Sequence, residues 1–478
     1  MNLADYSRLD ATGLAECIRR KDISAAEAQQ CARQAATALN PRINAMAELF
    51  DAPLSHDAQG PLGGVPFLIK DLVLQAEGVR CQAGSRLFGD GLPAAADSAL
   101  MARFRRAGLA TLGRTWTPEL GFNATTESAL GGATRNPWNL AHSAGGSSGG
   151  SAAAVVAGIV PMAHANDGGG SIRVPAAACG LIGLKSSRGR ISAGPGYGQP
   201  LMGLGMEGVV CRTVRDAAAA LDLMHGPELG DPFLMAAPAQ PYAQAIRSAP
   251  RRLRIAVSTQ FPGTQPAAQP CADAVEATAR TLAGLGHVVE WATPSYAHEA
   301  FFSATRTFWS SLLAAGVAGV AQALQMPLEK ALGQVQACTR ATAEHGLRLS
   351  ALDLELALAQ MNAVSREVAP FFAQHDILLT PTMRTPPVAL GYLDQDDPAR
   401  DAQGYFDHLF DYATFTPLAN LTGQPAISLP LGMAGDLPIG VQCMAPMGDE
   451  ATLLQLAAQL EQAMPWAARR PALHAAAL

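Results

Sequence analysis

The chain is short of charge, of paired cysteines and of long hydrophobic runs. Charged residues make up 15% of its 478 residues, the formal net charge is −6 and no long basic run occurs, which argues against nucleic acid as the main partner. Apolar runs such as residues 152–160 are too short to span a bilayer, and residues 1–24 lack the apolar core of a signal peptide. The eight cysteines form no Cys-x-x-Cys pair, which indicates neither a zinc site nor a disulfide framework and favours a reduced, cytoplasmic compartment.

Lysine is also scarce, because only four of the 34 basic residues are lysines. Arginine stays protonated in proteins, whereas lysine can lose its proton, so each lysine is of interest. Lys21 and Lys330 have charged neighbours and are predicted to be exposed on helices. Lys70 and Lys185 each end a short apolar run and are predicted to end core strands. Lys70 is the best candidate for a base with a pKa lowered by burial, although a strand-end lysine that reaches solvent fits the pattern equally well.

Predicted strands alternate with predicted helices along most of the chain. Short apolar runs predict strands at residues 65–69, 109–112, 253–257, 287–291, 376–380, 426–429 and 439–444. Amphipathic or small-residue patterns predict helices within residues 12–38, 97–106, 151–158, 272–285 and 450–464. This alternation is typical of an α/β fold with a large mixed, mainly parallel, twisted sheet flanked by helices. Residues 297–370 have few strand signals and are predicted to form a helical insertion that caps a site, within a single domain of residues 1–478.

Two glycine–serine clusters flank a short segment of small residues. They are residues 143–151 (SAGGSSGGS) and residues 166–173 (NDGGGSIR). Runs of glycine are costly in backbone entropy, so they indicate a sharp turn or a close approach to a ligand. Ser147 and Ser171, one in each cluster, are therefore candidate catalytic residues.

The first cluster also fits a different catalytic pattern. Residues 145–149 match the Gly-x-Ser-x-Gly nucleophile elbow, which would make Ser147 the nucleophile of an α/β-hydrolase-type esterase. That elbow requires a preceding strand, and the polar, proline-containing residues 135–142 are a poor strand. A serine nucleophile also needs a base, and His142 and His164 are alternatives to the lysine.

Taken together, these segments resemble the amidase signature family. The resemblance spans about residues 10–465 and is carried by residues 64–71 (GVPFLIKD), 145–151, 167–176, 179–190, 416–430 and 437–442. It implies a Ser–Ser–Lys triad with Ser171 as the acyl nucleophile, Ser147 as a bridging serine that follows a cis peptide bond, and Lys70 as the base. It also implies that Asp167 and Arg173 brace the nucleophile loop. The implied oxyanion hole consists of the backbone N–H groups of Gly168, Gly169, Gly170 and Ser171.

The resemblance further implies an activity. Family members hydrolyse carbon–nitrogen bonds, so the expected substrate is a neutral or apolar carboxamide, including cyclic amides, anilides and carbamates, with no cofactor or metal. Most members have Asp-Thr-Gly-Gly-Ser where this chain has Gly168, and the form seen here is similar to a subgroup that includes 6-aminohexanoate cyclic dimer hydrolases. Aryl acylamidases and urethanases share the wider family.

A glutamine-hydrolysing subunit of a tRNA-dependent amidotransferase is the alternative function. In that family member an acidic residue that recognises glutamine stands three residues before the threonine equivalent to Thr416, and this chain has Ala413 there. The substrate pocket is expected from residues 297–370 and the loop at 194–208. A monomer or homodimer is expected, and the candidate pocket residues are Gly146, Tyr197, Met202 and Trp309.

Overall fold

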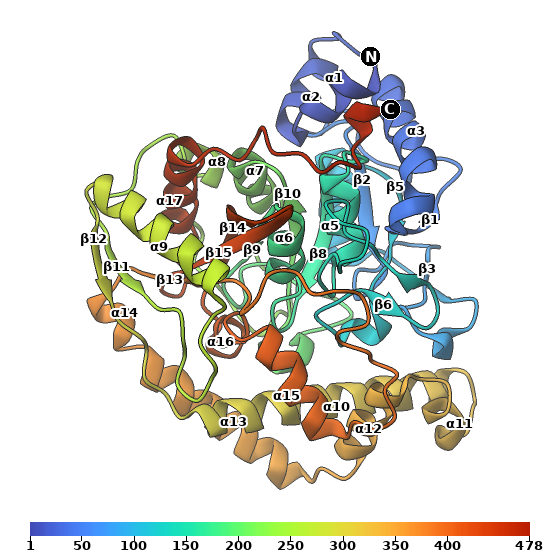
Figure 1. Cartoon of the computed structure of the whole chain (residues 1–478). Coiled ribbons are helices and arrows are strands. Elements are labelled where there is room, and N and C mark those ends of the chain that lie inside the picture. The colour runs from blue at the N-terminus through green and yellow to red at the C-terminus, as the bar shows by residue number, and fades with distance from the viewer.

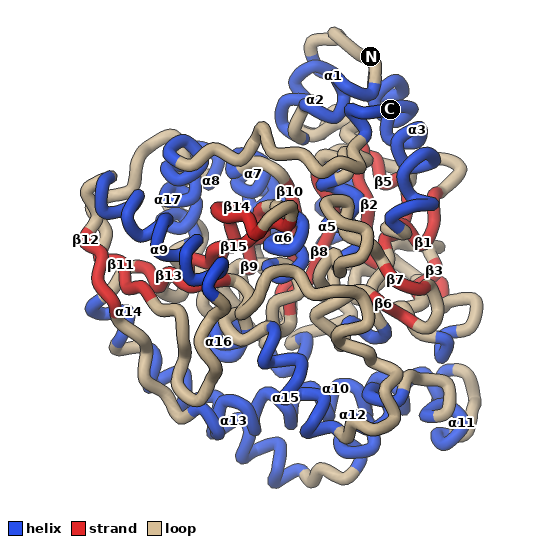
Figure 2. The backbone as a smooth tube through the Cα atoms, in the orientation of Figure 1, coloured by secondary structure: helices blue, strands red, loops and turns tan.

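The computed structural model describes residues 1–478 and is built around one eleven-stranded sheet (Figures 1 and 2). Its strands are β1 (Met46–Leu49), β2 (Pro66–Lys70), β5 (Ala110–Thr115), β8 (Met162–Asp167), β9 (Ile182–Lys185), β10 (Met206–Cys211), β11 (Arg254–Val257), β12 (Val288–Trp291), β13 (Ile377–Pro381), β14 (Ala426–Ala434) and β15 (Leu437–Met444). Their order across the sheet is β1-β5-β2-β8-β10-β9-β14-β15-β13-β11-β12. Two small two-stranded sheets join β3 (Arg80–Cys81) to β4 (Leu92–Pro93) and β6 (Glu127–Ser128) to β7 (Gly132–Ala133).

Helices surround the sheet. They are α1 (Leu3–Arg8), α2 (Ala11–Arg19), α3 (Ala25–Ile43), α4 (Ala99–Ala107), α5 (Gly149–Val156), α6 (Arg173–Cys179), α7 (Val214–Met224), α8 (Tyr242–Ala245), α9 (Gln269–Gly284), α10 (His298–Ala323), α11 (Leu328–Leu332), α12 (Ala337–Leu347), α13 (Ala351–Val368), α14 (Phe371–Gln374), α15 (Ala402–Tyr412), α16 (Pro417–Thr422) and α17 (Glu450–Ala463). Helices α5 and α6 pack on the central strands, and α7 and α17 pack against each other over β10 and β14. No helix is both long and apolar enough to cross a bilayer.

The sheet is mixed, as predicted, but the expectation that it is mainly parallel is wrong. Six of its ten strand pairings are antiparallel. One reason is that β14 and β15 form a hairpin whose turn contains Gly435 with φ of 62°. Such a tight turn returns the chain directly beside the strand it has left. The other reason is β10, which is antiparallel to both of its neighbours, β8 and β9.

Helix α5 shows why the first glycine–serine cluster has only small residues. All eight of its residues are buried, and the helix contacts β1, β2, β5, β8 and β10. A Cβ added at Gly150 would lie 2.5 Å from the carbonyl oxygen of Ala45 and 2.6 Å from the backbone nitrogen of Trp116. The backbone of α5 therefore lies directly against the sheet, which fixes the position of the serines at its N-terminal end.

Residues 297–370 are helical, as predicted, and contain α10, α11, α12 and α13. These helices share a separate hydrophobic core of 41 buried residues with α15, whereas the sheet and its flanking helices form a core of 78. Helix α15 lies outside the predicted insertion yet packs on α12, so the helical layer at the bottom of Figure 1 is assembled from two parts of the chain.

Candidate active site

Lys70 lies at the centre of the candidate site. It is the last residue of β2, whose five residues are all buried between β5 and β8, and its side chain is 1% exposed. Its Nζ lies 2.7 Å from Ser147 Oγ and 2.6 Å from Asn166 Oδ1. Burial lowers the pKa of Lys70 to about 7, against the opposing charges of Glu207 and Asp167. A large share of this lysine is therefore neutral near neutral pH.

Ser147 stands two residues before α5 and is 2% exposed. The Gly146–Ser147 peptide is cis, as the family resemblance implies. Glycine is required at 146 because a Cβ there would lie 2.4 Å from the carbonyl oxygen of Thr125. Residues 135–142 form no strand, so the context of a nucleophile elbow is missing.

Ser171 belongs to the loop of residues 168–172 between β8 and α6. It is partly buried and lines a cavity, and its side chain makes no hydrogen bond within the protein. A Cβ added at Gly169, two residues before Ser171, would have no atom within 4 Å, so this part of the loop faces open space. Ser171 is therefore the serine that a substrate in the cavity can reach.

The predicted oxyanion hole needs one correction. The N–H of Gly170 donates to Asp167 Oδ1 at 2.7 Å, which takes it away from the cavity. The N–H groups of Gly168, Gly169 and Ser171 have no acceptor within the protein. These three remain available to a developing negative charge.

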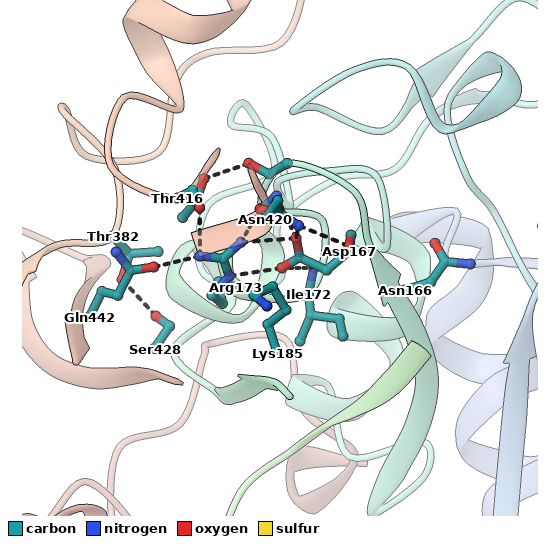
Figure 3. Close-up of polar contacts among 12 residues, drawn as sticks. Asn166, Asp167, Ile172, Arg173, Lys185, Thr382, Thr416, Asn420, Ser428 and Gln442 are labelled. Carbon is teal, nitrogen blue, oxygen red and sulfur yellow. Dashed lines mark hydrogen bonds and ion pairs between the residues drawn. The ribbon is translucent and has the colours of Figure 1, made fainter. Parts of the chain in front are cut away.

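Asp167 and Arg173 brace the loop as predicted, through an ion pair in which both side chains are 0% exposed (Figure 3). Arg173 Nε donates to Asp167 Oδ2 at 2.8 Å, and its Nη2 donates to Oδ1 at 2.9 Å. The same guanidinium donates to Asn420 Oδ1, Gln442 Oε1 and the Thr416 carbonyl at 2.6, 2.8 and 2.8 Å. Burial opposes ionisation of Asp167, yet the charge and hydrogen bonds of Arg173 outweigh it and hold the pKa of that carboxyl well below its ordinary value.

A cavity opens beside Ser171, with about 360 Å³ of empty space that includes its opening to solvent. Gly146 and Trp309 line it, as predicted, whereas Tyr197 and Met202 do not. Tyr197 is 43% exposed on its loop, and Met202 packs at the edge of the second core. The cavity is lined by Gly121, Phe122, Asn123, Ala124, Gly146, Gly169, Gly170, Ser171, Val174, Trp309, Leu409, Phe410 and Ala413.

Trp309, from helix α10, forms a wall that reaches the nucleophile loop. A Cβ added at Gly168 would lie 3.2 Å from Trp309 Cζ2 and 3.0 Å from Leu201 Cδ2. The φ of Gly168 is not positive, so its backbone would accept a side chain, but Leu201 and the indole would have to shift slightly to admit one. The indole also packs on Phe122, with ring centroids 5.2 Å apart. Gly168 thus lets Leu201 and the indole of Trp309 pack closely on the loop of residues 168–172.

Neither candidate histidine side chain hydrogen-bonds to Ser147 or Ser171. His164 Nδ1 accepts a hydrogen bond from the backbone N–H of Lys70 at 3.2 Å, and its Nε2 lies 2.6 Å from Glu207 Oε2. His142 forms a backbone bridge with Ala389. Sequence reasoning missed two polar groups near the lysine, Asn166 and Glu207, because their signal is their place in the sheet, on β8 beside β2 and on β10 beyond it.

Asp167→Asn is expected to destabilise the protein and to abolish activity. The substitution leaves the Arg173 guanidinium buried without its counter-charge, which costs about 3–5 kcal/mol. Thermal unfolding followed by circular dichroism measures this loss. The exposed aspartate Asp407, changed to Asn in the same way, serves as the control and should unfold as the wild type does. An Asp167→Asn protein with wild-type stability and activity would contradict the bracing role.

Comparisons with known proteins find relatives along the whole chain. The family described as Amidase matches residues 18–454. A 6-aminohexanoate-cyclic-dimer hydrolase of Paenarthrobacter ureafaciens is 39% identical over 477 residues, which cover 97% of this chain and 96% of that protein. A solved structure of 6-aminohexanoate cyclic dimer hydrolase complexed with substrate has a TM-score of 0.90 at 37% identity, covering 98% of this chain and 99% of that one. A glutamyl-tRNA(Gln) amidotransferase chain from Thermotoga maritima is more distant, with a TM-score of 0.79 at 25% identity and 99% coverage of both chains.

Proposed function

Since this chain belongs to the amidase signature family and is a hydrolase of carbon–nitrogen bonds other than peptide bonds, we propose that it cleaves neutral carboxamides through an acyl-enzyme on Ser171. One observation carries the proposal. The Nζ of the buried Lys70 lies 2.7 Å from Ser147 Oγ. Ser147 precedes α5, which packs against α6, the helix that follows the Ser171 loop. A lysine held out of water next to a hydroxyl is a base that can accept its proton.

In the first half of the reaction, neutral Lys70 takes the proton of Ser147 Oγ, and Ser147 takes the proton of Ser171. Ser171 Oγ then bonds to the amide carbon, and the carbonyl oxygen becomes an oxyanion. The free N–H groups of the loop supply donors for this charge, and loss of one such donor typically costs about 3–4 kcal/mol of transition-state stabilisation.

In the second half, the proton returns through Ser147 to the nitrogen of the leaving amine as the carbon–nitrogen bond breaks. Water then enters and loses its proton to the same relay. Its oxygen bonds to the acyl carbon, the ester bond to Ser171 breaks, and the relay returns the proton to Ser171 Oγ as a carboxylic acid leaves. Protons, bonds and charges balance, because the first proton that Lys70 takes goes to the leaving amine and the second returns to Ser171.

The lining of the cavity supports a neutral and largely apolar substrate. No ionisable side chain lines it, and Phe122, Trp309, Leu409 and Phe410 give it an apolar surface. An unpaired charge placed in such a site would lose its hydration without compensation. The relatives that act on a cyclic dimer support a cyclic amide as one substrate, and linear amides, anilides and carbamates remain within the proposal.

The amidotransferase alternative has less support. Ala413, at the position of the glutamine-recognising acid, lines the cavity and offers no charge to the ammonium group of glutamine. The esterase alternative would need Ser147 as nucleophile, yet this serine is 2% exposed. Purified protein that hydrolyses neutral amides without any partner decides for the amidase.

The compartment and assembly remain part of the proposal. All eight cysteines are unpaired, which supports a reducing, cytoplasmic compartment. We infer a small-molecule amide as the partner, and a monomer or homodimer as the working assembly. The helical layer of residues 297–370 would act as the cap, since Trp309 on α10 lines the cavity.

Three alanine substitutions test the catalytic roles. Lys70→Ala, Ser147→Ala and Ser171→Ala should each lower kcat on neutral amides by a factor on the order of 10⁴ or more, because the three side chains act as one relay. Lys330→Ala, which removes an exposed lysine, is the control and should leave kcat unchanged. A fully active Lys70→Ala enzyme would refute the base assignment, and activity that survives in Ser171→Ala but not in Ser147→Ala would favour the esterase.

The state of Lys70 predicts the pH dependence. Only neutral lysine can accept the proton of Ser147, so kcat/KM should rise with pH through about 7 and then level off. The negative charge of Glu207 raises the pKa of Lys70, so Glu207→Gln should move this rise to lower pH. Initial rates measured across the pH range with a neutral amide check both. A profile without any decline on the acid side would contradict a titrating lysine base.

Substitutions at Gly168 and Trp309 test the cavity wall. Gly168→Thr should lower kcat/KM for small amides, because its side chain meets the indole and Leu201. Trp309→Ala enlarges the cavity and should favour bulkier amides. The double variant should recover activity that Gly168→Thr loses, which a double-mutant cycle measures as a coupling energy. Trp291→Ala, at an exposed tryptophan, is the control. Strictly additive effects would show that the two residues do not share this wall.

A further inference from the structure

Asn166 occupies the side of the Lys70 ammonium group that Ser147 leaves free. Asn166 Oδ1 lies 2.6 Å from Lys70 Nζ, and Asn166 is 8% exposed. Asn166 and Asp167 follow one another at the end of β8, and consecutive side chains of a strand point to opposite faces. Figure 3 shows this separation, with Asn166 directed away from the Asp167–Arg173 pair.

The orientation of the Asn166 amide is fixed by its second partner. Its Nδ2 donates to the carbonyl oxygen of Leu72 at 3.0 Å. Flipping the amide would place Asn166 Oδ1 against the Leu72 carbonyl oxygen, so that two acceptors would face each other. It would also direct the Nδ2–H donors at Lys70 Nζ. The oxygen of the amide therefore faces Lys70, where it can only accept a hydrogen bond.

An acceptor in this position determines where the lone pair of the base points. A neutral amine has two N–H bonds and one lone pair. Because Asn166 Oδ1 takes an N–H of Lys70, the lone pair is left for the hydroxyl hydrogen of Ser147, 2.7 Å away. We propose that Asn166 is a positioning residue that directs the lone pair of Lys70 at Ser147, an inference that rests on the proposed function.

Asn166 suits both states of the base. When the Ser147 O–H bond breaks and an Nζ–H bond forms, Lys70 gains a positive charge and a third N–H. It then donates to Asn166 Oδ1 and to Ser147 Oγ together, so its position need not change. Ser147 at the same time takes the proton of Ser171, whose oxygen forms the bond to carbon. An amide serves this purpose better than a carboxylate, because a negative charge there would hold the lysine protonated.

Other charged groups near Lys70 have different partners. Glu207 on β10 lies against His164 Nε2, and His164 in turn accepts the backbone N–H of Lys70 through Nδ1. Asp167 is paired with Arg173 on the far side of β8. Neither acid hydrogen-bonds to the Nζ atom, so Ser147 and Asn166 are its only hydrogen-bond partners.

Two substitutions test the inference by pH–rate profiles of kcat/KM and kcat on a neutral amide. Asn166→Asp keeps the shape and adds a charge, so the rise of kcat/KM with pH should move upward by about 1–3 pH units, with activity recovered at high pH. Asn166→Ala removes the acceptor, so kcat should fall about tenfold at every pH while KM stays unchanged. Asn362→Asp, the same change at an exposed position on α13, should leave the profile unmoved.

An Asn166→Asp profile that rises at the wild-type pH, or an Asn166→Ala enzyme with wild-type kcat, would overturn the inference. Should the aspartate variant fail to fold, the alanine variant decides, since a loss confined to kcat in a protein with wild-type thermal unfolding supports positioning and an unchanged kcat refutes it. A wild-type protein that hydrolyses no amide would instead refute the proposed function.

Discussion

The buried pair of Asp167 and Arg173 is the interaction on which the rest of the site depends. The carboxylate accepts the N–H groups of Gly170 and Ile172 in addition to the guanidinium, so it sets the course of the nucleophile loop. Burying two charges costs several kcal/mol per ion before any attraction is counted, and such pairs seldom add net stability. The contribution of this pair is therefore conformational. It selects one path for the loop and leaves the N–H of Ser171 free.

Lys70 and Asp167 end the neighbouring parallel strands β2 and β8, yet burial affects their ionisation differently. Asp167 meets a guanidinium and stays ionised, whereas Lys70, one strand away, meets only the neutral oxygens of Ser147 and Asn166. Both groups are equally deprived of water, so the difference lies in the partner each one finds. Asp167 on β8 stays ionised and Lys70 on β2 titrates because their side chains leave the sheet toward different surroundings.

The sequence predicted much of this arrangement and missed its cross-strand parts. Lys70 and the two serines were identifiable because each stands in a distinctive local pattern, and the strands near 65–69 and 253–257 follow from short apolar runs. β8 was not predicted, because its residues are small or polar and its burial comes from neighbouring strands. The prediction of a mainly parallel sheet was wrong for a related reason. The direction of each pairing depends on which strands become neighbours, and that is not visible in the local sequence. Tyr197 and Met202 do not line the cavity, because the loop leaves Tyr197 exposed and packs Met202 against the helical core.

Arg173 joins segments that lie far apart in the sequence. Its partners Asn420 and Gln442 lie roughly 250 residues further along, on α16 and β15. A chain still under synthesis can already contain Lys70, Ser147 and Ser171 without the contacts that shape the loop around them. The contacts that hold this loop are therefore complete only when α16 and β15 have joined the fold.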